Sequence, residues 1–283
     1  MFTRFLAIFF GCRLAAMGAE QTPTPRHDPL DQLFRRAPMA ESARSIVVNL
    51  GTNLHAAFDT ERARVHTIWK GGPLNLWGPP YSHSKSPFIA NFEGERVFSF
   101  PQEGVWNSPT EPMKIDYLGV RIEGNAVRFE YEAGDVRIVE TLEGVAAGEE
   151  WMVRRTFEFP EGGNRLEAMS YLAFAEAGAK IEEGRVVKIQ GTNGVAYFTL
   201  EPAAFRWTVG NFEADYKSEL ITEAGTEKGN PMAPHRGREA RVFVELPKNG
   251  DRFSFSIVMS SGPKPLRIPS RPVEKGKVFC SRR

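Results

Sequence analysis

Cysteine is scarce in this sequence, with 2 residues among 283. Cys12 and Cys280 can build neither a disulfide scaffold nor a cysteine-rich metal site. If Cys12 is removed with a leader, as its neighbours suggest, no internal disulfide can form in the mature chain. Stability then has to come from the burial of apolar side chains and from hydrogen bonds.

An excess of one charge is also missing, because 36 basic residues face 35 acidic ones and the net charge is +1. This balance excludes a general electrostatic attraction to nucleic acid or to an anionic membrane. No apolar run reaches about 18 residues, so a multi-span membrane protein is excluded as well. A hydrophobic content of 41% with 25% charged residues is typical of a globular protein.

The N-terminus has the pattern of a secretory signal peptide. Arg4 precedes the apolar run Phe5–Phe10, and small residues follow up to Ala19, so residues 1–19 are expected to be removed. The loss of this leader leaves a net charge of −1. A lipid anchor at Cys12 is the alternative, although the bulky residue before Gly-Cys argues against it. The sequence thus predicts a periplasmic or extracellular protein.

Apolar and polar residues alternate with a period of two in many short segments. Clear examples are Asn125–Glu132, Trp151–Phe159 and Arg252–Met259. Glycine- and asparagine-rich turn signals separate such segments at intervals of about 8–14 residues, which is typical of antiparallel hairpins. We count about 14 candidate strands and no long amphipathic helix. The sequence therefore predicts an all-β fold, a large two-sheet antiparallel sandwich.

The domain organisation follows from changes in composition. Residues 20–44 are polar and contain four prolines, and we expect a leader there. Strands begin with Ser45–Leu50, and the next two, Leu54–Asp59 and Ala63–Trp69, have the spacing of a hairpin. Residues 45–262 are expected to form the sandwich domain. Residues 263–283 are basic and contain several prolines, and they are expected to form an extended tail.

A resemblance begins at Asn53–Thr60 and Arg64–Gly72, and it continues in Tyr117–Val120, Val127–Tyr131 and Val136–Glu140. These segments resemble a β-rich module of secreted planctomycete and verrucomicrobial proteins, which is often attached to c-type cytochrome or haem-bearing dehydrogenase domains. The resemblance implies a secreted haem-protein partner. This chain has no Cys-x-x-Cys-His sequence, so it cannot attach haem covalently. In outline the expected sandwich is also similar to the galactose mutarotase-like supersandwich of carbohydrate enzymes.

One segment, Trp69–Lys85, concentrates aromatic, basic and glycine residues. Aromatic faces stack on flat ligands such as sugar rings, and Lys and His can hydrogen-bond hydroxyl groups. The candidate ligand-binding residues around this segment are Trp69, Lys70, Trp77, Tyr81, His83 and the more distant Trp106. The alternative is that these aromatics close one end of the sandwich core, because large aromatic side chains often serve burial first.

A second candidate segment, Pro231–Arg238, is rich in proline and arginine and precedes a strand. His235 and Arg236 could hold an anionic group there, since guanidinium groups match carboxylates. The alternative is a solvated loop.

Catalytic and metal sites have candidate residues, but no spacing selects among them. An acid–base pair would join His83 or His235 to Glu213, Asp215 or Glu239, and a lyase-like version would use Tyr81, Arg236 and Arg238. His55 and His66 could start a metal site with Asp59 or Glu61, but nothing fixes a third ligand, and ordinary structural histidines are the alternative. No P-loop, dinucleotide-binding or nucleophile-elbow motif occurs, so no cofactor and no metal are predicted.

The sequence therefore predicts an exported β-sandwich protein that binds a small-molecule or glycan ligand through an aromatic loop, with no reaction assigned. One alternative is a carbohydrate-active enzyme of the epimerase or lyase type. The other is an accessory subunit of a secreted redox complex.

Overall fold

The computed structural model describes the following residues of the chain: 34–39, 42–51, 53–75, 90–99, 105–107, 113–123, 126–161, 170–177, 179–184, 186–191, 194–216, 235–246, 252–264, 266–267 and 280–281. These residues form strands and connecting turns, and no helix occurs among them. No helix that could cross a membrane is therefore found in this part of the chain.

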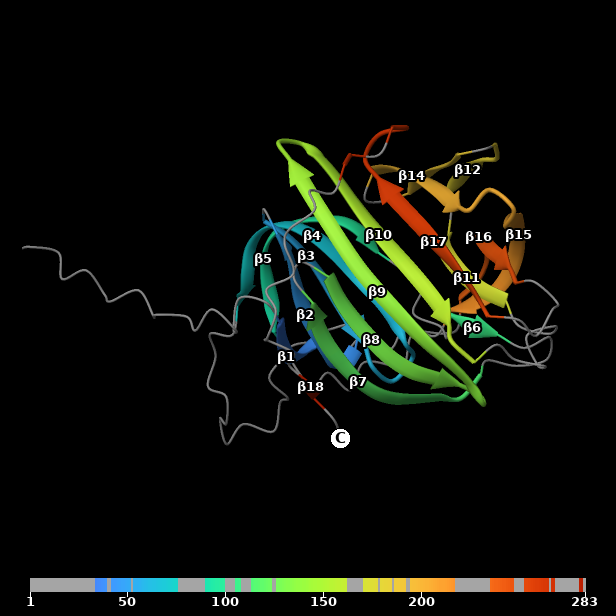
Figure 1. The fold of residues 1–283 in the computed structure, drawn as a ribbon. Coiled ribbons are helices and arrows are strands. Elements are labelled where there is room, and N and C mark those ends of the chain that lie inside the picture. Colours follow the sequence, from blue (N-terminus) through green and yellow to red (C-terminus); the bar gives the residue numbers. More distant parts are fainter. Residues whose placement is uncertain are drawn as a thin grey trace, which may run out of the picture.

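The strands form three antiparallel sheets (Figure 1). The first has five strands in the order β1 (Phe34–Met39), β2 (Ser42–Gly51), β3 (Leu54–Asp59), β4 (Arg64–Asn75) and β5 (Asn91–Ser99). The second has nine, in the order β12 (Lys180–Glu182), β13 (Val187–Gly191), β14 (Gly194–Glu201), β17 (Phe253–Ser260), β10 (Glu150–Phe159), β9 (Val136–Ala147), β8 (Ala126–Ala133), β7 (Ile115–Glu123) and β18 (Cys280–Ser281). The third has four, in the order β15 (Arg206–Tyr216), β16 (His235–Glu245), β11 (Ser170–Ala177) and β6 (Trp106–Asn107).

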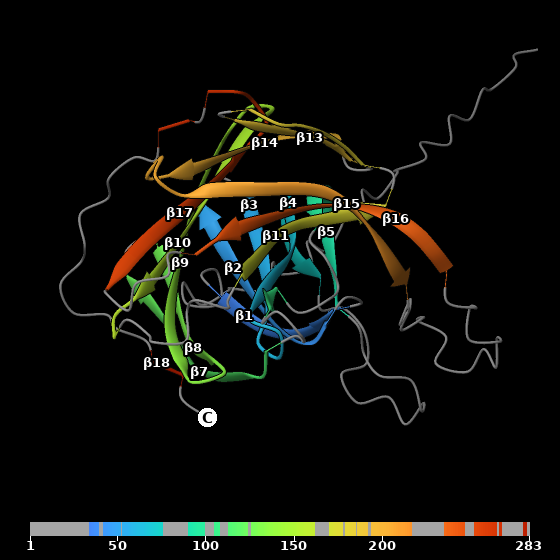
Figure 2. The same cartoon turned by 90° about the vertical axis from the view of Figure 1, so that its right-hand side faces the viewer.

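The predicted all-β sandwich is confirmed, with one difference in its second layer. The nine-stranded sheet forms one layer, and the other layer is divided between the five-stranded and four-stranded sheets (Figures 1 and 2). One continuous hydrophobic core, here called the main core, takes buried side chains from all three sheets. The two smaller sheets therefore share the inner face of the large one.

Strand alternation places the main-core side chains. In β8 every second residue is buried, including Val127, Phe129 and Tyr131. Such alternation sends successive side chains to opposite faces of a sheet, so one face is dry. Across the sandwich, the ring of Phe58 on β3 stacks on Phe129 with a centroid distance of 3.9 Å.

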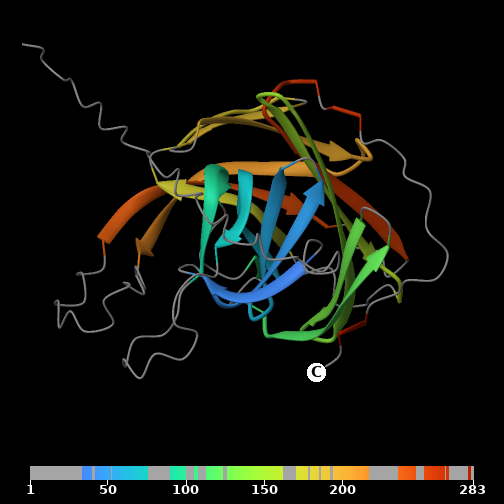
Figure 3. The same cartoon turned by 90° about the vertical axis from the view of Figure 1, so that its left-hand side faces the viewer.

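A smaller second core lies on the other face of the five-stranded sheet. This sheet is strongly curved (Figure 3). The backbone N–H of Ala90 donates to the carbonyl of Pro38 at 2.8 Å. That bond ties the start of β5 to β1 at opposite edges of the sheet. The side chains enclosed are those of Ala37, Met39, Val47, Ala57, Trp69, Leu74 and Ala90.

The outer face of the nine-stranded sheet carries a lattice of ion pairs. Arg128 lies 3.1 Å from Glu158, and Arg137 lies 3.0 Å from Glu130. Further pairs on this sheet join Arg121 to Glu123 and Glu130, Arg128 to Glu123, Arg137 to Glu161 and Arg154 to Glu201. These ion pairs link neighbouring strands across the outer face of the sheet.

Two elements lie where the sequence predicted irregular chain. β1 and the first residues of β2 fall inside the expected leader 20–44, and β1 pairs with β2 over most of its length. At the other end, Cys280 and Ser281 pair with Arg121 and Val120 of β7 at the edge of the large sheet. The predicted hairpin of Leu54–Asp59 is found, with its second strand extended to Asn75. Residues 1–19, the predicted signal peptide, lie outside the described residues.

Candidate functional site

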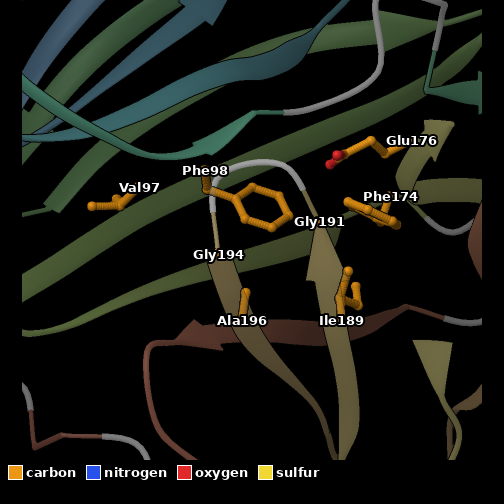
Figure 4. Close-up of a pocket in the computed structure, with 8 residues that line it drawn as sticks. All are labelled: Val97, Phe98, Phe174, Glu176, Ile189, Gly191, Gly194 and Ala196. Atoms are coloured by element: carbon orange, nitrogen blue, oxygen red, sulfur yellow. The ribbon is translucent and has the colours of Figure 1, made fainter. Parts of the chain in front are cut away.

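A small pocket, here called the junction pocket, lies where the three sheets meet (Figure 4). The five-stranded sheet contributes two lining residues from β5, the four-stranded sheet two from β11, and the large sheet four from the β13–β14 hairpin. The lining residues are Val97, Phe98, Phe174, Glu176, Ile189, Gly191, Gly194 and Ala196. The enclosed space is about the size of one water molecule.

The floor of the junction pocket is aromatic. The rings of Phe98 and Phe174 lie 5.7 Å apart between centroids, and Phe198 lies 5.4 Å from Phe98 and 6.3 Å from Phe174. All three side chains belong to the main core. Since each comes from a different strand, the floor is held by packing from several directions and is rigid.

Glu176 is the charged residue of the junction pocket, and strand alternation explains its position. Phe174 faces the main core, and Glu176 is the next residue on the same face of β11, where the core ends. The side chain is half-buried and turns its carboxylate toward the pocket (Figure 4).

Gly191 makes room for this carboxylate. A Cβ atom at position 191 would overlap Oε2 of Glu176 and would lie 3.0 Å from its Cδ. On the other side of the turn, Gly194 has φ +108°, a backbone conformation that other residues rarely adopt. The β13–β14 hairpin can therefore approach Glu176 because residue 191 is glycine, and glycine at position 194 allows the backbone conformation of the turn.

The register of the four-stranded sheet extends polar positions beyond the junction pocket. Ala240 lies opposite Glu176 on one side and opposite Asn211 on the other. Further along the β15–β16 hairpin, the opposite pairs are Glu213 with Arg238 and Asp215 with Arg236.

Trp69, one of the predicted ligand-binding residues, is fully buried in the second core. Its indole Nε1 donates to the carbonyl of Gly72 at 3.1 Å. Its ring stacks between His55, at 5.1 Å, and Phe92, at 4.7 Å. The burial of Trp69 favours the packing alternative for this residue, since its ring has no surface to offer a ligand.

Trp106 is buried in the main core instead. Its Nε1 donates to the hydroxyl of Tyr131 at 3.2 Å, and its ring packs against Tyr171 at 4.7 Å. Packing is again the role that burial favours. Trp69 and Trp106 thus lie in different cores and do not form one aromatic surface.

Lys70 is the predicted residue that reaches the surface. Its ammonium group donates to the carbonyl of Glu149 at 3.1 Å and lies 3.3 Å from the carboxylate of the same residue. Trp77, Tyr81 and His83 lie outside the described residues. For His235 and Arg236 the backbone is described, at the far end of β16.

The two histidines considered for a metal site have other roles. His66 Nε2 lies 2.9 Å from the hydroxyl of Ser45, and its Nδ1 lies 3.0 Å from the hydroxyl of Thr67. Burial lowers the pKa of His55, and a hydrogen bond with the backbone of Gly71 opposes that effect. Within the described part of the chain, no three His, Cys, Asp or Glu residues gather in a metal-binding arrangement.

The residues of the acid–base alternative on the β15–β16 hairpin are described by their backbone alone. In the register, His235 lies opposite Tyr216, and Glu239 lies opposite Phe212. His235 and Glu239 are four positions apart along β16, which is about 13 Å between backbone positions. The acid–base pair therefore stays a prediction.

A buried polar cluster in the main core is absent from the sequence prediction. Arg155 lies 2.7 Å from Glu140, and Tyr131 donates to the same carboxylate at 3.0 Å. The guanidinium of Arg155 also lies over the rings of Phe157 and Tyr171, at 5.2 and 5.4 Å. Burial raises the pKa of Tyr171 and of Tyr131, so both hydroxyls stay protonated. Because these side chains are sealed from solvent, the cluster is structural.

A signal for this cluster was present in the sequence. In the alternating segment Trp151–Phe159, Arg155 occupies an inward position between Val153 and Phe157. Glu140 likewise follows Ile138 on the inward face of β9. Two opposite charges at inward positions of neighbouring predicted strands indicate a buried pair, because an unpaired charge is costly to bury.

No family model matches this chain, and no curated protein matches it. Among solved structures, it is similar to a heparinase III, with 9% identity and a TM-score of 0.43 over 81% of this chain and 36% of that one. It is also similar to the heparan sulfate lyase HepC from Pedobacter heparinus, with 10% identity and a TM-score of 0.39 over 80% and 36%. A 4-alpha-glucanotransferase from Thermococcus litoralis gives 8% and 0.36 over 76% and 37%.

The chain thus spans little more than a third of the length of these structures. None of the three TM-scores reaches 0.5.

Proposed function

We propose that this protein binds a carbohydrate-like ligand at the junction pocket. The observation that carries the proposal is the carboxylate of Glu176 beside a rigid aromatic floor, at a point where three sheets meet. Binding sites commonly combine an apolar lining with a few well-placed polar groups.

The chemistry of the junction pocket matches the two kinds of surface that a sugar offers. A carboxylate accepts hydrogen bonds from hydroxyl groups, and such bonds to a charged acceptor are stronger than those between neutral groups. The apolar lining around Phe98 can contact the C–H groups of the ring. Since the enclosed space holds a group the size of a water molecule, one substituent would enter while the ring stays at the rim.

The aromatic loop remains a prediction beside this proposal. Its flanking residues Asn75 and Asn91 lie opposite each other at the end of the β4–β5 ladder. Asn91 is six residues from Val97 at the junction pocket, which is about 20 Å along an extended strand. A ligand of several sugar units would be needed to contact both regions. Export to the periplasm or the extracellular space also remains a prediction from residues 1–19.

The test is binding across a panel of oligosaccharides, measured by isothermal titration calorimetry. Glu176→Ala is expected to weaken binding roughly tenfold or more, because hydrogen bonds to a charged group contribute about 1.5–3 kcal/mol. Lys180→Ala, on the exposed edge strand β12, is the control and should bind like the native protein. Trp77→Ala and Tyr81→Ala examine the loop separately. Native-like binding by Glu176→Ala would remove the junction pocket from the site.

A further inference from the structure

We infer, on the basis of the proposed function, that the junction pocket is a subsite for a methyl group. The preferred ligand would then be a 6-deoxy sugar, in which a methyl group replaces the hydroxymethyl group of an ordinary hexose. The proposed function names a carbohydrate-like ligand, and the lining of the pocket narrows it to this class of sugar.

The wall of the junction pocket away from Glu176 is apolar. Val97 and Phe98 line it from β5, and Ile189 and Ala196 line it from the β13–β14 hairpin. Val97 is half-buried, and the other three side chains are buried in the main core. In Figure 4, Glu176 lies on one side of the pocket, and Ile189 and Ala196 lie on the opposite side. An apolar group in this space therefore contacts hydrocarbon on several sides, and its removal from water stabilises the complex.

The enclosed space of the junction pocket has room for one heavy atom with its hydrogens. It is about the size of a water molecule, and a methyl group is only slightly larger. A hydroxymethyl group brings a second heavy atom, which enters only if the walls move. Movement of these walls is unfavourable, because most of the lining side chains are packed in the main core.

Polarity separates a methyl group from a hydroxyl group, which also has one heavy atom. A hydroxyl group on the apolar side of the pocket loses its hydrogen bonds with water, and the side chains of Phe98, Ile189 and Ala196 offer no replacement. A methyl group has no hydrogen bonds to lose. It also needs no contact with Glu176, which already has an interaction within the protein. A ring hydroxyl at the rim can still donate to Glu176, since a carboxylate has about four acceptor positions.

Two lining residues allow the space to be filled or enlarged. Ala196→Val adds two carbons at a buried lining position and should fill the space that the methyl group of the sugar would enter. Ile189→Val removes one carbon from another buried lining position and should enlarge that space. The matched control is Ile138→Val, because Ile138 is also buried in the main core but lies on β9, outside the junction pocket.

The experiment compares methyl glycosides that differ only in the substituent at the fifth ring carbon. L-fucose has a methyl group there, L-galactose has a hydroxymethyl group, and D-arabinose has hydrogen. The corresponding sets built on L-rhamnose and on 6-deoxy-D-glucose cover other ring configurations. Titrations followed by NMR measure each affinity. In the configuration that binds, the native protein is expected to bind the 6-deoxy sugar roughly threefold to tenfold more tightly than either of the other two.

Ala196→Val should remove the advantage over the sugar with hydrogen, Ile189→Val should reduce the advantage over the hydroxymethyl sugar, and Ile138→Val should keep both. Thermal unfolding checks that each variant is folded. Equal affinity of the native protein for the 6-deoxy and hydroxymethyl sugars would overturn the inference, and so would an unchanged preference in either lining variant that folds. Binding that is still weakened by Glu176→Ala would then leave the proposed function standing. If no glycoside and no oligosaccharide binds, the proposed function fails as well.

Discussion

The main core and the second core are built in different ways. In the main core, aromatic rings from all three sheets surround a buried ion pair, Arg155 with Glu140, on neighbouring strands. In the second core, one curved sheet encloses Trp69, and β4 and β5 approach so closely that a Cβ atom at Gly71 would lie 2.7 Å from the Cα of Gly94. The main core depends on a matched pair of charges, and the second core lies beside a close backbone contact between β4 and β5.

Each core therefore tolerates a different kind of substitution. The main core can lose both charges together, because two apolar side chains of similar volume can replace a buried ion pair, but it cannot lose one of them. Beside the second core, the backbone contact between β4 and β5 has no room for even one added carbon at Gly71 or Gly94. A substitution that deletes one charge should therefore test the main core, and a substitution that adds a methyl group should test the contact beside the second core.

The largest effect is expected from Arg155→Met. This substitution leaves the carboxylate of Glu140 buried without its cation, and it should lower the free energy of unfolding by about 3–5 kcal/mol at pH 7. The double variant with Glu140→Leu should regain most of that loss. Denaturant unfolding of the native chain and both variants gives the three values.

The matched control on the outer face of the same sheet is Arg128→Met, which removes an exposed ion pair with Glu158. Its cost should stay below about 1 kcal/mol, as for other surface pairs. Burial raises the pKa of Glu140, and Arg155 opposes this. Without Arg155 the pKa rises further, so the cost of Arg155→Met should shrink as pH falls and Glu140 becomes protonated. Equal costs for Arg155→Met and Arg128→Met would contradict the role given to charge in the main core.

The sheet that encloses the second core should be sensitive at Gly94, an exposed position where β5 contacts β4. This residue has φ +149°, and a Cβ atom there would overlap the carbonyl oxygen of Lys70. Gly94→Ala should therefore cost about 1–3 kcal/mol, the usual range for forcing extra atoms into a packed region. Thermal and denaturant unfolding measure this cost, and Gly262→Ala, with open space around its Cα, should show none. If Gly94→Ala and Gly262→Ala were equally stable, β4 and β5 would be able to separate at this contact without a loss of stability.

Much of this architecture could be predicted from the sequence. The period-two alternation in Asn125–Glu132 and Trp151–Phe159 gave the correct faces of β8 and β10, because side-chain alternation is a local property of an extended chain. The hairpin of Leu54–Asp59 with the next strand could also be predicted, because its two strands are close in sequence. The division of the second layer into two sheets could not be predicted, since alternation does not specify which distant strands pair. β6 and β11, for example, pair across more than sixty residues of sequence.

The candidate site was harder to predict for the same reason. Composition drew attention to Trp69 and Trp106, but their burial depends on what packs over them, and they lie in separate cores. The junction pocket takes residues from β5, β11, β13 and β14, and no short motif joins those strands. Glu176 lies near the end of β11, and its place at the pocket depends on the distant β13–β14 hairpin that lies beside it.

The smallest effect concerns pH and His55, in the second core. Because burial lowers its pKa from 6.5, the folded protein holds this proton less tightly than the unfolded chain does. The stability due to neutral His55 is fully present above pH 6.5 and is lost as pH falls from that value through the lowered pKa. His55→Phe keeps a flat ring against Trp69 and removes the titration, so its stability should vary less between pH 7 and pH 5. Unfolding free energies at both pH values measure this, and an identical decrease in the two proteins would assign the loss to another group.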